Sequence, residues 1–201
     1  MPTTSSPDGS GVRESLEEAV EAWRDHADMG RLLDDLEKLF EHADAGQLAA
    51  AVERFLSIPE VAGPVYERIV AERPDDARAL VILANAYWLS GRGPDVVGAL
   101  ASRAIAADPA NRGAWHLWSL SESDIRERVG RWQQVTIRFP SDDLARANLA
   151  DNAASLASGE RDPEALALAI ESYEALLATA THDTQRSALQ KALQTLRGWK
   201  L

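Results

Sequence analysis

Residue types that commonly carry catalysis are few and scattered in this sequence. It contains no cysteine, which removes thiol nucleophiles, disulfides and cysteine-ligated metals together. None of its four histidines, His26, His42, His116 and His182, lies in the His-Glu-x-x-His spacing that binds zinc on one face of a helix. His26 and Asp28 are two residues apart, and side chains at that spacing diverge on a helix. No metal, cofactor or catalytic residue is therefore predicted.

Two other local patterns are explained by helix architecture. Gly91-Arg92-Gly93-Pro94 is glycine-rich, but no Gly-Lys-Ser/Thr follows and no strand is expected before it. It predicts a turn between helices and not a phosphate-binding loop. The acid pairs Asp75-Asp76 and Asp142-Asp143 lie at expected helix starts, where carboxylates stabilise the positive end of the helix dipole. We therefore predict that the chain is not an enzyme.

Charge is distributed unevenly along the 201 residues. The chain carries 21 Lys and Arg against 32 Asp and Glu, a net charge of −11. Residues 1–73 hold −9 of this charge, and residues 74–201 hold −2. An acidic protein repels phosphate backbones, so no nucleic-acid partner is expected. The acidic N-terminal third is either a solvated helix surface or a docking surface for a basic partner.

No segment of the sequence predicts export or membrane insertion. Residues 1–11 are rich in Pro, Ser, Thr and Gly, and lack the basic and apolar regions of a signal peptide. No apolar run approaches the roughly 18 residues needed to span a bilayer. We expect a cytoplasmic protein whose residues 1–11 are disordered.

Elsewhere, apolar residues recur at helical spacing, and the alternation typical of strands is nearly absent. Ala and Leu, both strong helix formers, are abundant. Pro and Gly interrupt the pattern at short intervals and mark helix boundaries. Eleven helices are therefore predicted, over residues 12–28, 31–43, 46–57, 60–73, 76–90, 94–107, 111–123, 125–138, 142–158, 163–180 and 184–198. The loops between them are short, as in antiparallel helical hairpins.

These helices are expected to repeat in pairs. Pro74-Asp75-Asp76, Pro109-Ala110-Asn111 and Pro140-Ser141-Asp142 align, at intervals of 35 and 31 residues. The Asp or Asn two residues after each Pro is expected to cap the next helix by accepting its free N–H groups. A helical-pair repeat of about 34 residues is typical of an α-solenoid, in which each pair packs on its neighbours.

The pattern resembles the tetratricopeptide repeat (TPR) family. The block Asp108–Trp115 closely matches that family's turn-and-helix signature, and the resemblance covers residues 60–180 and is weak before them. The repeats are degenerate, because Glu122 and Arg126 stand where the family prefers an aromatic residue and a glycine, and Arg146 where a bulky apolar residue is usual. The resemblance implies an all-α, TPR-like α-solenoid. Its expected parts are acidic N-terminal helices over residues 12–57, TPR-like repeats over 58–182 and a C-terminal capping helix over 183–201.

The resemblance also implies where a partner would bind. In the TPR family, the first helix of each pair lines a concave groove. By alignment, the groove residues are Arg78, Val81, Ile82, Asn85, Trp88 and Leu89, then His116, Leu117, Leu120 and Asp124, then Ala147, Asn148, Asp151 and Ser155. Some members clamp a C-terminal carboxylate with a lysine, but Val81 takes its place here. The groove is expected to be apolar at its centre, which suits an extended segment or an amphipathic helix.

The tryptophans and one arginine-rich stretch have structural interpretations. Trp115 and Trp118 lie at repeat-core spacing and, like Trp132, are expected to pack inside the stack. For Trp88, exposure on the groove face and packing both stay open. Arg126, Arg128, Arg131 and Arg138 lie near Glu122, Asp124 and Glu127 in sequence and are expected to form surface ion pairs.

Two functional classes remain. The preferred one is a non-catalytic adaptor that binds a peptide or protein segment in the groove of the solenoid. The other is an accessory or regulatory subunit that docks on an enzyme or secretion complex through its acidic N-terminal helices. Both imply a protein partner, and neither fixes the oligomeric state.

Overall fold

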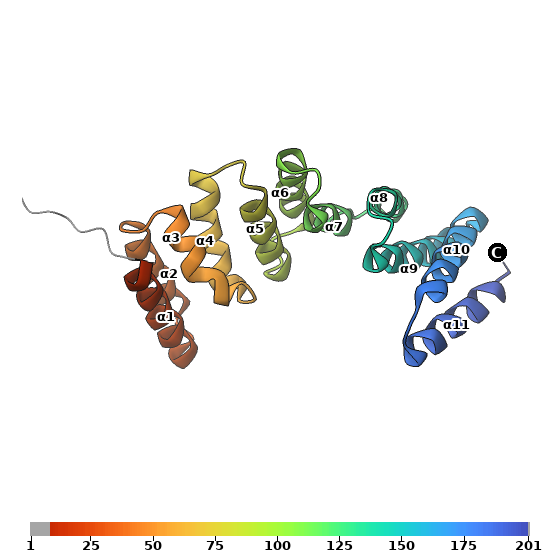
Figure 1. The fold of residues 1–201 in the computed structure, drawn as a ribbon, viewed down its shortest axis with the longest axis horizontal. Coiled ribbons are helices and arrows are strands. Elements are labelled where there is room, and N and C mark those ends of the chain that lie inside the picture. Colours follow the sequence, from red (N-terminus) through yellow and green to blue (C-terminus); the bar gives the residue numbers. More distant parts are fainter. Residues whose placement is uncertain (1–8, 201) are drawn as a thin grey trace, which may run out of the picture. The chain divides into compact units, whose positions relative to one another are not determined.

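The chain folds into short antiparallel helices (Figure 1). The computed structural model describes residues 9–200, and within them there are eleven α-helices, one 3-10 turn and no strand. The helices are α1 (Gly9–His26), α2 (Met29–Phe40), α3 (Ala45–Val52), α4 (Pro59–Glu72), α5 (Ala77–Leu89), α6 (Pro94–Ala107), α7 (Arg112–Leu120), α8 (Ile125–Arg138), α9 (Asp143–Glu160), α10 (Pro163–Thr179) and α11 (Asp183–Arg197). The 3-10 turn η1 (Glu53–Phe55) directly follows α3.

The prediction of an all-α fold is confirmed, and each predicted helix has its counterpart. The bounds of α6 and α8 agree with the prediction to the residue. Four ends differ by three residues or more: α2 stops at Phe40 and not at 43, α3 at Val52 and not at 57, and α7 at Leu120 and not at 123, while α1 begins at Gly9, within the segment expected to be disordered. Residues 1–8 of that segment lie outside the described residues.

Contacts divide the chain into two compact units. The N-terminal unit ends at Leu117 and the C-terminal unit begins at Trp118, so the division falls inside α7. The sequence suggested other divisions, after residues 57 and 182. Each unit is a set of packed helical hairpins and is described by itself.

One core pattern recurs on α1, α3 and α5, the first helices of the three hairpins in the N-terminal unit. Each set starts with a leucine that is followed three, four and seven positions later by further apolar or aromatic residues; the sets begin at residues 16, 48 and 80, and the second one ends in η1. The sets are Leu16, Ala19, Val20 and Trp23; Leu48, Ala51, Val52 and Phe55; and Leu80, Leu83, Ala84 and Tyr87. All are buried except Trp23 and Tyr87, which are half-buried. Because such positions share one side of a helix, α1, α3 and α5 turn equivalent sides to the core.

The aligned turns cap their helices as predicted. The side chains of Asp76, Asn111 and Asp142 each accept a hydrogen bond from the backbone N–H three residues ahead, at 3.0, 3.2 and 3.1 Å. Each bond satisfies an N–H that has no partner within its own helix, and such a cap contributes about 1 kcal/mol to stability.

The glycine-rich segment before α6 is a helix-to-helix turn, as predicted. Gly91 and Gly93 have φ angles of 71° and 98°, in the left-handed region that a side chain would disfavour. Pro94 then occupies the first turn of α6, where its missing N–H costs nothing.

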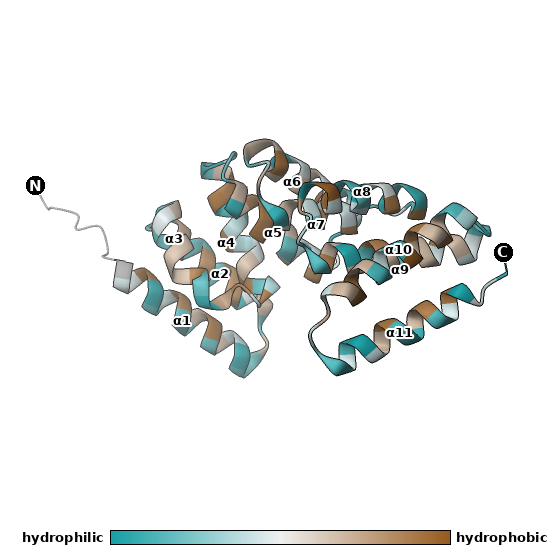
Figure 2. Ribbon diagram, turned by 45° about the vertical axis from the view of Figure 1, so that its right-hand side comes forward, coloured by the Kyte–Doolittle hydropathy of each residue, from teal (hydrophilic) through white to brown (hydrophobic). Residues whose placement is uncertain are grey.

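The C-terminal unit is built around Trp132 of α8, which is completely buried, as predicted. Its last helix, α11, packs on α10 and buries Leu193 and Leu196, while residues 183–188 are exposed. Hydrophilic and hydrophobic residues alternate along α11 and along α1, as expected of helices with one buried side (Figure 2). This polar exterior agrees with a helix that covers the end of a stack.

Candidate interaction surface

The exposed side of α5 carries the strongest candidate site. We call it the α5 face and define it by Arg78, Val81, Ile82, Asn85, Trp88 and Leu89. The opposite side of the helix is buried and holds Ala79, Leu80, Leu83, Ala84 and Ala86. Trp88 is 41% exposed and Leu89 is 56% exposed, and half-buried Val81 and Ile82 lie beside them. Adjacent large apolar side chains on a surface are typical of an interaction site.

Charged residues border the α5 face and are paired. Arg78 donates two hydrogen bonds to the Glu53 carboxylate of η1, at 2.8 and 2.7 Å. The neighbouring Arg54 forms an ion pair with Glu17 of α1. Asn85 differs: among residues 9–200, no partner bonds to its side-chain amide. The amide can therefore orient a bound segment without breaking an existing bond.

The first part of α7 lies next to this face within the N-terminal unit. A Cβ added at Gly113 would come 3.3 Å from Val81 Cγ1, so the two helices are close there. His116 is half-buried. The expectation that Leu117 lines the groove is wrong, because its side chain is buried, with 6% exposure.

In the C-terminal unit, several predicted groove residues already hold the fold. Asp124 caps α8 by accepting hydrogen bonds from two backbone N–H groups, both at 2.9 Å. Asn148 donates to the backbone carbonyl of Leu144 at 2.9 Å, and Asp151 accepts from the hydroxyl of Tyr173. Leu120 is half-buried. These polar groups are less available to a partner than Asn85.

Two exposed apolar residues of the C-terminal unit were not predicted. Leu144 is 62% exposed and precedes Asn148 and Asp151 by four and seven positions, so it lies on the same side of α9. The helical spacing of Leu144, Asn148 and Asp151 was a sequence signal that could have predicted this position. Ile137 on α8 is 78% exposed, and no sequence signal marks it.

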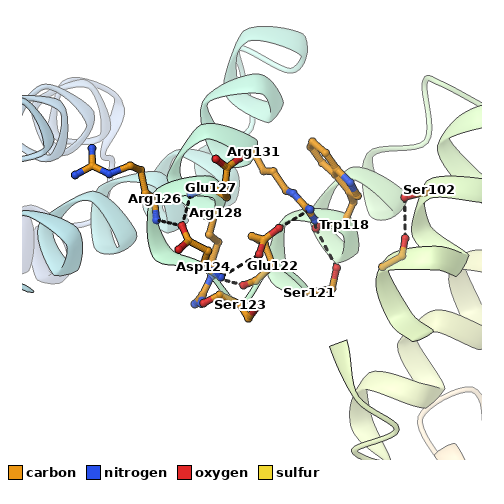
Figure 3. Close-up of polar contacts among 11 residues, drawn as sticks. Ser102, Trp118, Ser121, Glu122, Ser123, Asp124, Arg126, Glu127, Arg128 and Arg131 are labelled. Atoms are coloured by element: carbon orange, nitrogen blue, oxygen red, sulfur yellow. Dashed lines mark hydrogen bonds and ion pairs between the residues drawn. The ribbon is translucent and has the colours of Figure 1, made fainter. Parts of the chain in front are cut away.

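An arginine network holds the turn between α7 and α8 (Figure 3). The Arg131 guanidinium lies 4.4 Å from the centre of the Trp118 ring, donates to the Trp118 carbonyl at 2.7 Å and pairs with Glu122 at 2.5 Å. Arg128 donates to the Glu122 carbonyl at 2.7 Å. Glu122, which departs from the TPR pattern, is therefore bound by two arginines of α8. Arg131 pairs with the nearby Glu122, as expected, whereas Arg126 pairs with Glu160 and Asp162, which are distant in sequence.

All three tyrosines have raised pKa values. Burial is the first cause in each case, because the charged phenolate is disfavoured away from water. Tyr87 also donates to Glu67 at 2.6 Å, and its pKa is raised to about 12. Tyr173 donates to Asp151, which raises its pKa further. Tyr66, on α4 where that helix packs against α5, has a pKa raised chiefly by burial.

We expect phenolate absorbance at 295 nm to rise only above pH 10 in the folded protein. In about 6 M guanidinium chloride the midpoint should return to about 10, the value of a free tyrosine. Because the folded chain holds these protons longer than the unfolded one, stability should fall as pH rises from 10 toward 12. Tyr87→Phe should remove one step of the titration. A folded-state midpoint at or below 10 would contradict this result.

The C-terminal unit has two concave surfaces between its helices. One cleft of about 770 Å³ lies between α10 and α11, where Arg197 pairs with Glu174 beside Leu177. Another, of about 350 Å³, is lined by residues of α8, α9 and α10. Within residues 9–200, no group of three His, Asp or Glu side chains is placed to hold a metal ion. Over the same range, no helix combines the length and apolar character that crossing a bilayer requires.

Comparison with known proteins gives structural similarity only. No protein-family model and no curated protein matches the sequence. PilF of Pseudomonas aeruginosa matches with a TM-score of 0.62 at 13% identity, over 94% of this chain and 86% of that one. A crystal structure of MamA matches with a TM-score of 0.57 at 16% identity, over 76% of this chain and 91% of that one.

A third structure is a thermophilic TPR protein from Thermus thermophilus. It matches with a TM-score of 0.55 at 14% identity, over 92% of this chain and 98% of that one. At sequence identities this low, structural similarity establishes the fold but does not transfer a function. Together with the repeated core pattern and the caps, these similarities show that the chain has the α-solenoid fold of TPR proteins.

Proposed function

We propose that the chain is a non-catalytic adaptor that binds a peptide or protein segment on the α5 face. One observation carries the proposal: Trp88 and Leu89 are adjacent, large, apolar and exposed, on a helix whose opposite side is core. Tryptophan is a frequent energetic anchor of protein interfaces. The Asn85 amide, on the same side of the helix, would fix the orientation of the bound segment.

The fold favours recognition of a segment over recognition of a small molecule. The α5 face is a helix surface and not an enclosed cavity, so it suits an extended stretch or one side of an amphipathic helix. Asn148 and Asp151 remain a separate, weaker candidate surface, because both already bond within the C-terminal unit. A cytoplasmic location and the lack of catalytic activity are part of this proposal.

Docking through the acidic N-terminal helices is the second candidate. It is supported by four exposed carboxylates of α1, Glu14, Glu18, Glu21 and Asp25, none of which has an ion-pair partner among the described residues. Such docking would weaken steeply with salt, because exposed charges are screened beyond about 8 Å at physiological ionic strength.

The test begins with capture of the partner from the native source and its identification by mass spectrometry. Calorimetry then compares the chain with its Trp88→Ala/Asn85→Ala variant, which should bind at least about 30-fold more weakly if Trp88 is an interface anchor. Ile137→Ala, which removes an exposed apolar residue of the C-terminal unit outside both candidate surfaces, should bind normally. Undiminished binding by the double variant would exclude the α5 face.

Substitution is preferable to deletion when the acidic helices are tested. Helices α1 and α2 bury Leu16, Val20, Leu32 and Leu36, so removing residues 12–43 would expose the core of the unit. Changing Glu14, Glu18 and Glu21 to glutamine removes the charge and leaves the packing intact.

A further inference from the structure

The positions of the α5 face have equivalents on α3 and on the acidic helix α1. These three helices share one core pattern, so equivalent positions on them point to the same side of the stack. The positions equivalent to the α5 face are Gly46, Ala49 and Ala50 on α3, Glu53 on η1, and Leu56 and Ser57 directly after η1. On α1 they are Glu14, Glu17, Glu18, Glu21, Arg24 and Asp25.

Two ion pairs support this alignment. Arg78 of the α5 face binds Glu53 of η1 at 2.7 Å, and Arg54, the next residue along η1, binds Glu17 of α1. The same short turn therefore contacts both outer helices. At these equivalent positions, the side chains are mostly acidic on α1, small and mostly uncharged on α3, and mostly apolar on α5.

The acidic part of this surface is not neutralised within the protein. Among residues 9–200, Glu14, Glu18, Glu21 and Asp25 form no ion pair, although other acids of this unit do. Glu14 and Glu18, and likewise Glu21 and Asp25, lie four residues apart, a spacing at which like charges repel on a helix. A cationic segment would relieve that repulsion.

We propose that the occupant of the α5 face is a basic segment of a protein partner, with apolar residues on Trp88 and Leu89 and Lys or Arg residues against α1. This inference rests on the proposed function and adds the chemistry of the partner to it. Charge complementarity supports it, because residues 1–73 carry −9 of the net charge while the exposed Trp88 and Leu89 of the α5 face are apolar.

Helix spacing sets the length of the segment. Helix α1 packs on α3, and Arg78 of α5 pairs with Glu53 directly after α3, so about two helix spacings of about 8–10 Å, or about 16–20 Å in all, separate α1 from α5. An extended chain covers that distance in about five or six residues. The apolar and basic residues of the partner should therefore be separated by about that number of positions.

The experiment uses three synthetic peptides that share a Leu-Trp-Leu block and a five-residue Gly/Ser spacer. The first ends in four lysines, the second in four glutamines and the third in four glutamates. Binding to the full chain is measured by fluorescence anisotropy at low and high salt. The lysine peptide should bind at least about tenfold more tightly than the glutamine peptide at low salt, with the difference shrinking near 1 M.

Matched variants separate the two parts of the surface. The Glu18→Gln/Glu21→Gln variant should bind the lysine and glutamine peptides with more similar affinities than the unchanged chain does. Asp34→Asn/Glu37→Gln removes the same charge from exposed positions of α2. This variant should keep most of the difference in affinity between the two peptides. Trp88→Ala/Leu89→Ala should weaken the binding of every peptide that binds the unchanged chain.

The outcomes distinguish this inference from the proposed function. If the glutamine or glutamate peptide binds as tightly as the lysine peptide and binding needs Trp88 and Leu89, the α5 face binds segments but the basic occupant is wrong. If the α2 control reduces the affinity difference between the lysine and glutamine peptides as much as the α1 variant does, the basic residues do not contact α1. If Trp88→Ala/Leu89→Ala changes nothing, or no peptide binds at about 1 mM, the proposed function fails as well.

Discussion

Replacing Trp132 with alanine is expected to lower the free energy of unfolding of the C-terminal unit by about 3–5 kcal/mol. Trp132 is completely buried and is the largest of the fully buried side chains. Its removal leaves a cavity that the surrounding helices cannot fill without moving, so lost transfer free energy and lost packing add together. Domains of this size have a total stability of about 5–15 kcal/mol, so the loss would be a large fraction.

Denaturant unfolding followed by circular dichroism measures this loss, and amide hydrogen exchange locates it. Exchange should accelerate in α8, α9 and α10 more than in α1 to α6. Ile137→Ala on the same helix is the control, because that side chain is 78% exposed and its removal should change stability by less than about 0.5 kcal/mol. Equal effects of the two substitutions would show that Trp132 does not anchor the unit.

The second large effect is expected at Arg131. Arg131→Ala removes the contact with the Trp118 ring, the hydrogen bond to the Trp118 carbonyl and the ion pair with Glu122. The side chains of Arg131 and Glu122 are only 25% and 17% exposed, so water replaces these contacts poorly. The expected loss of stability is about 2–3 kcal/mol.

Two comparisons test that explanation. Adding Glu122→Gln to Arg131→Ala should recover part of the loss, because the unpaired carboxylate left behind is then neutral. Arg126→Ala removes an arginine from ion pairs that are more exposed, with a 56% exposed side chain, and should cost less than about 1 kcal/mol. If Arg126→Ala destabilised the chain as much as Arg131→Ala, burial would not be the cause.

Most of the local architecture could be predicted from the sequence. Helix bounds, caps and the turn at Gly91–Pro94 depend on neighbouring residues: Pro and Gly limit the backbone, and Asp or Asn bonds to N–H groups within three positions. The side of α5 that faces outward followed from the alignment with the TPR family. The 32-residue spacing of Leu16, Leu48 and Leu80 also indicates a repeat over α1, α3 and α5. The TPR resemblance did not point to it, because that resemblance is weak before residue 60.

Residues in contact across long sequence separations could not be predicted. Nothing near Asp151 indicates that it accepts a hydrogen bond from Tyr173, and nothing near Glu53 indicates that it binds Arg78. Leu117 was expected in the groove because of its position in the repeat, yet it is buried. Exposure depends on what packs against a residue, and a single helix does not contain that information.

The sequence by itself determined that this protein is an all-α solenoid with degenerate TPR-like repeats, because helix propensity, helix breakers and caps act over a few residues. Only the tertiary structure decided which polar residues are already used in bonds and which apolar residues stay exposed. It left Asn85, Trp88 and Leu89 exposed on α5, and it joined Glu17 of α1 and Arg78 of α5 to the adjacent residues Arg54 and Glu53 of η1. The physical reason is that burial and pairing arise when helices distant in sequence pack together.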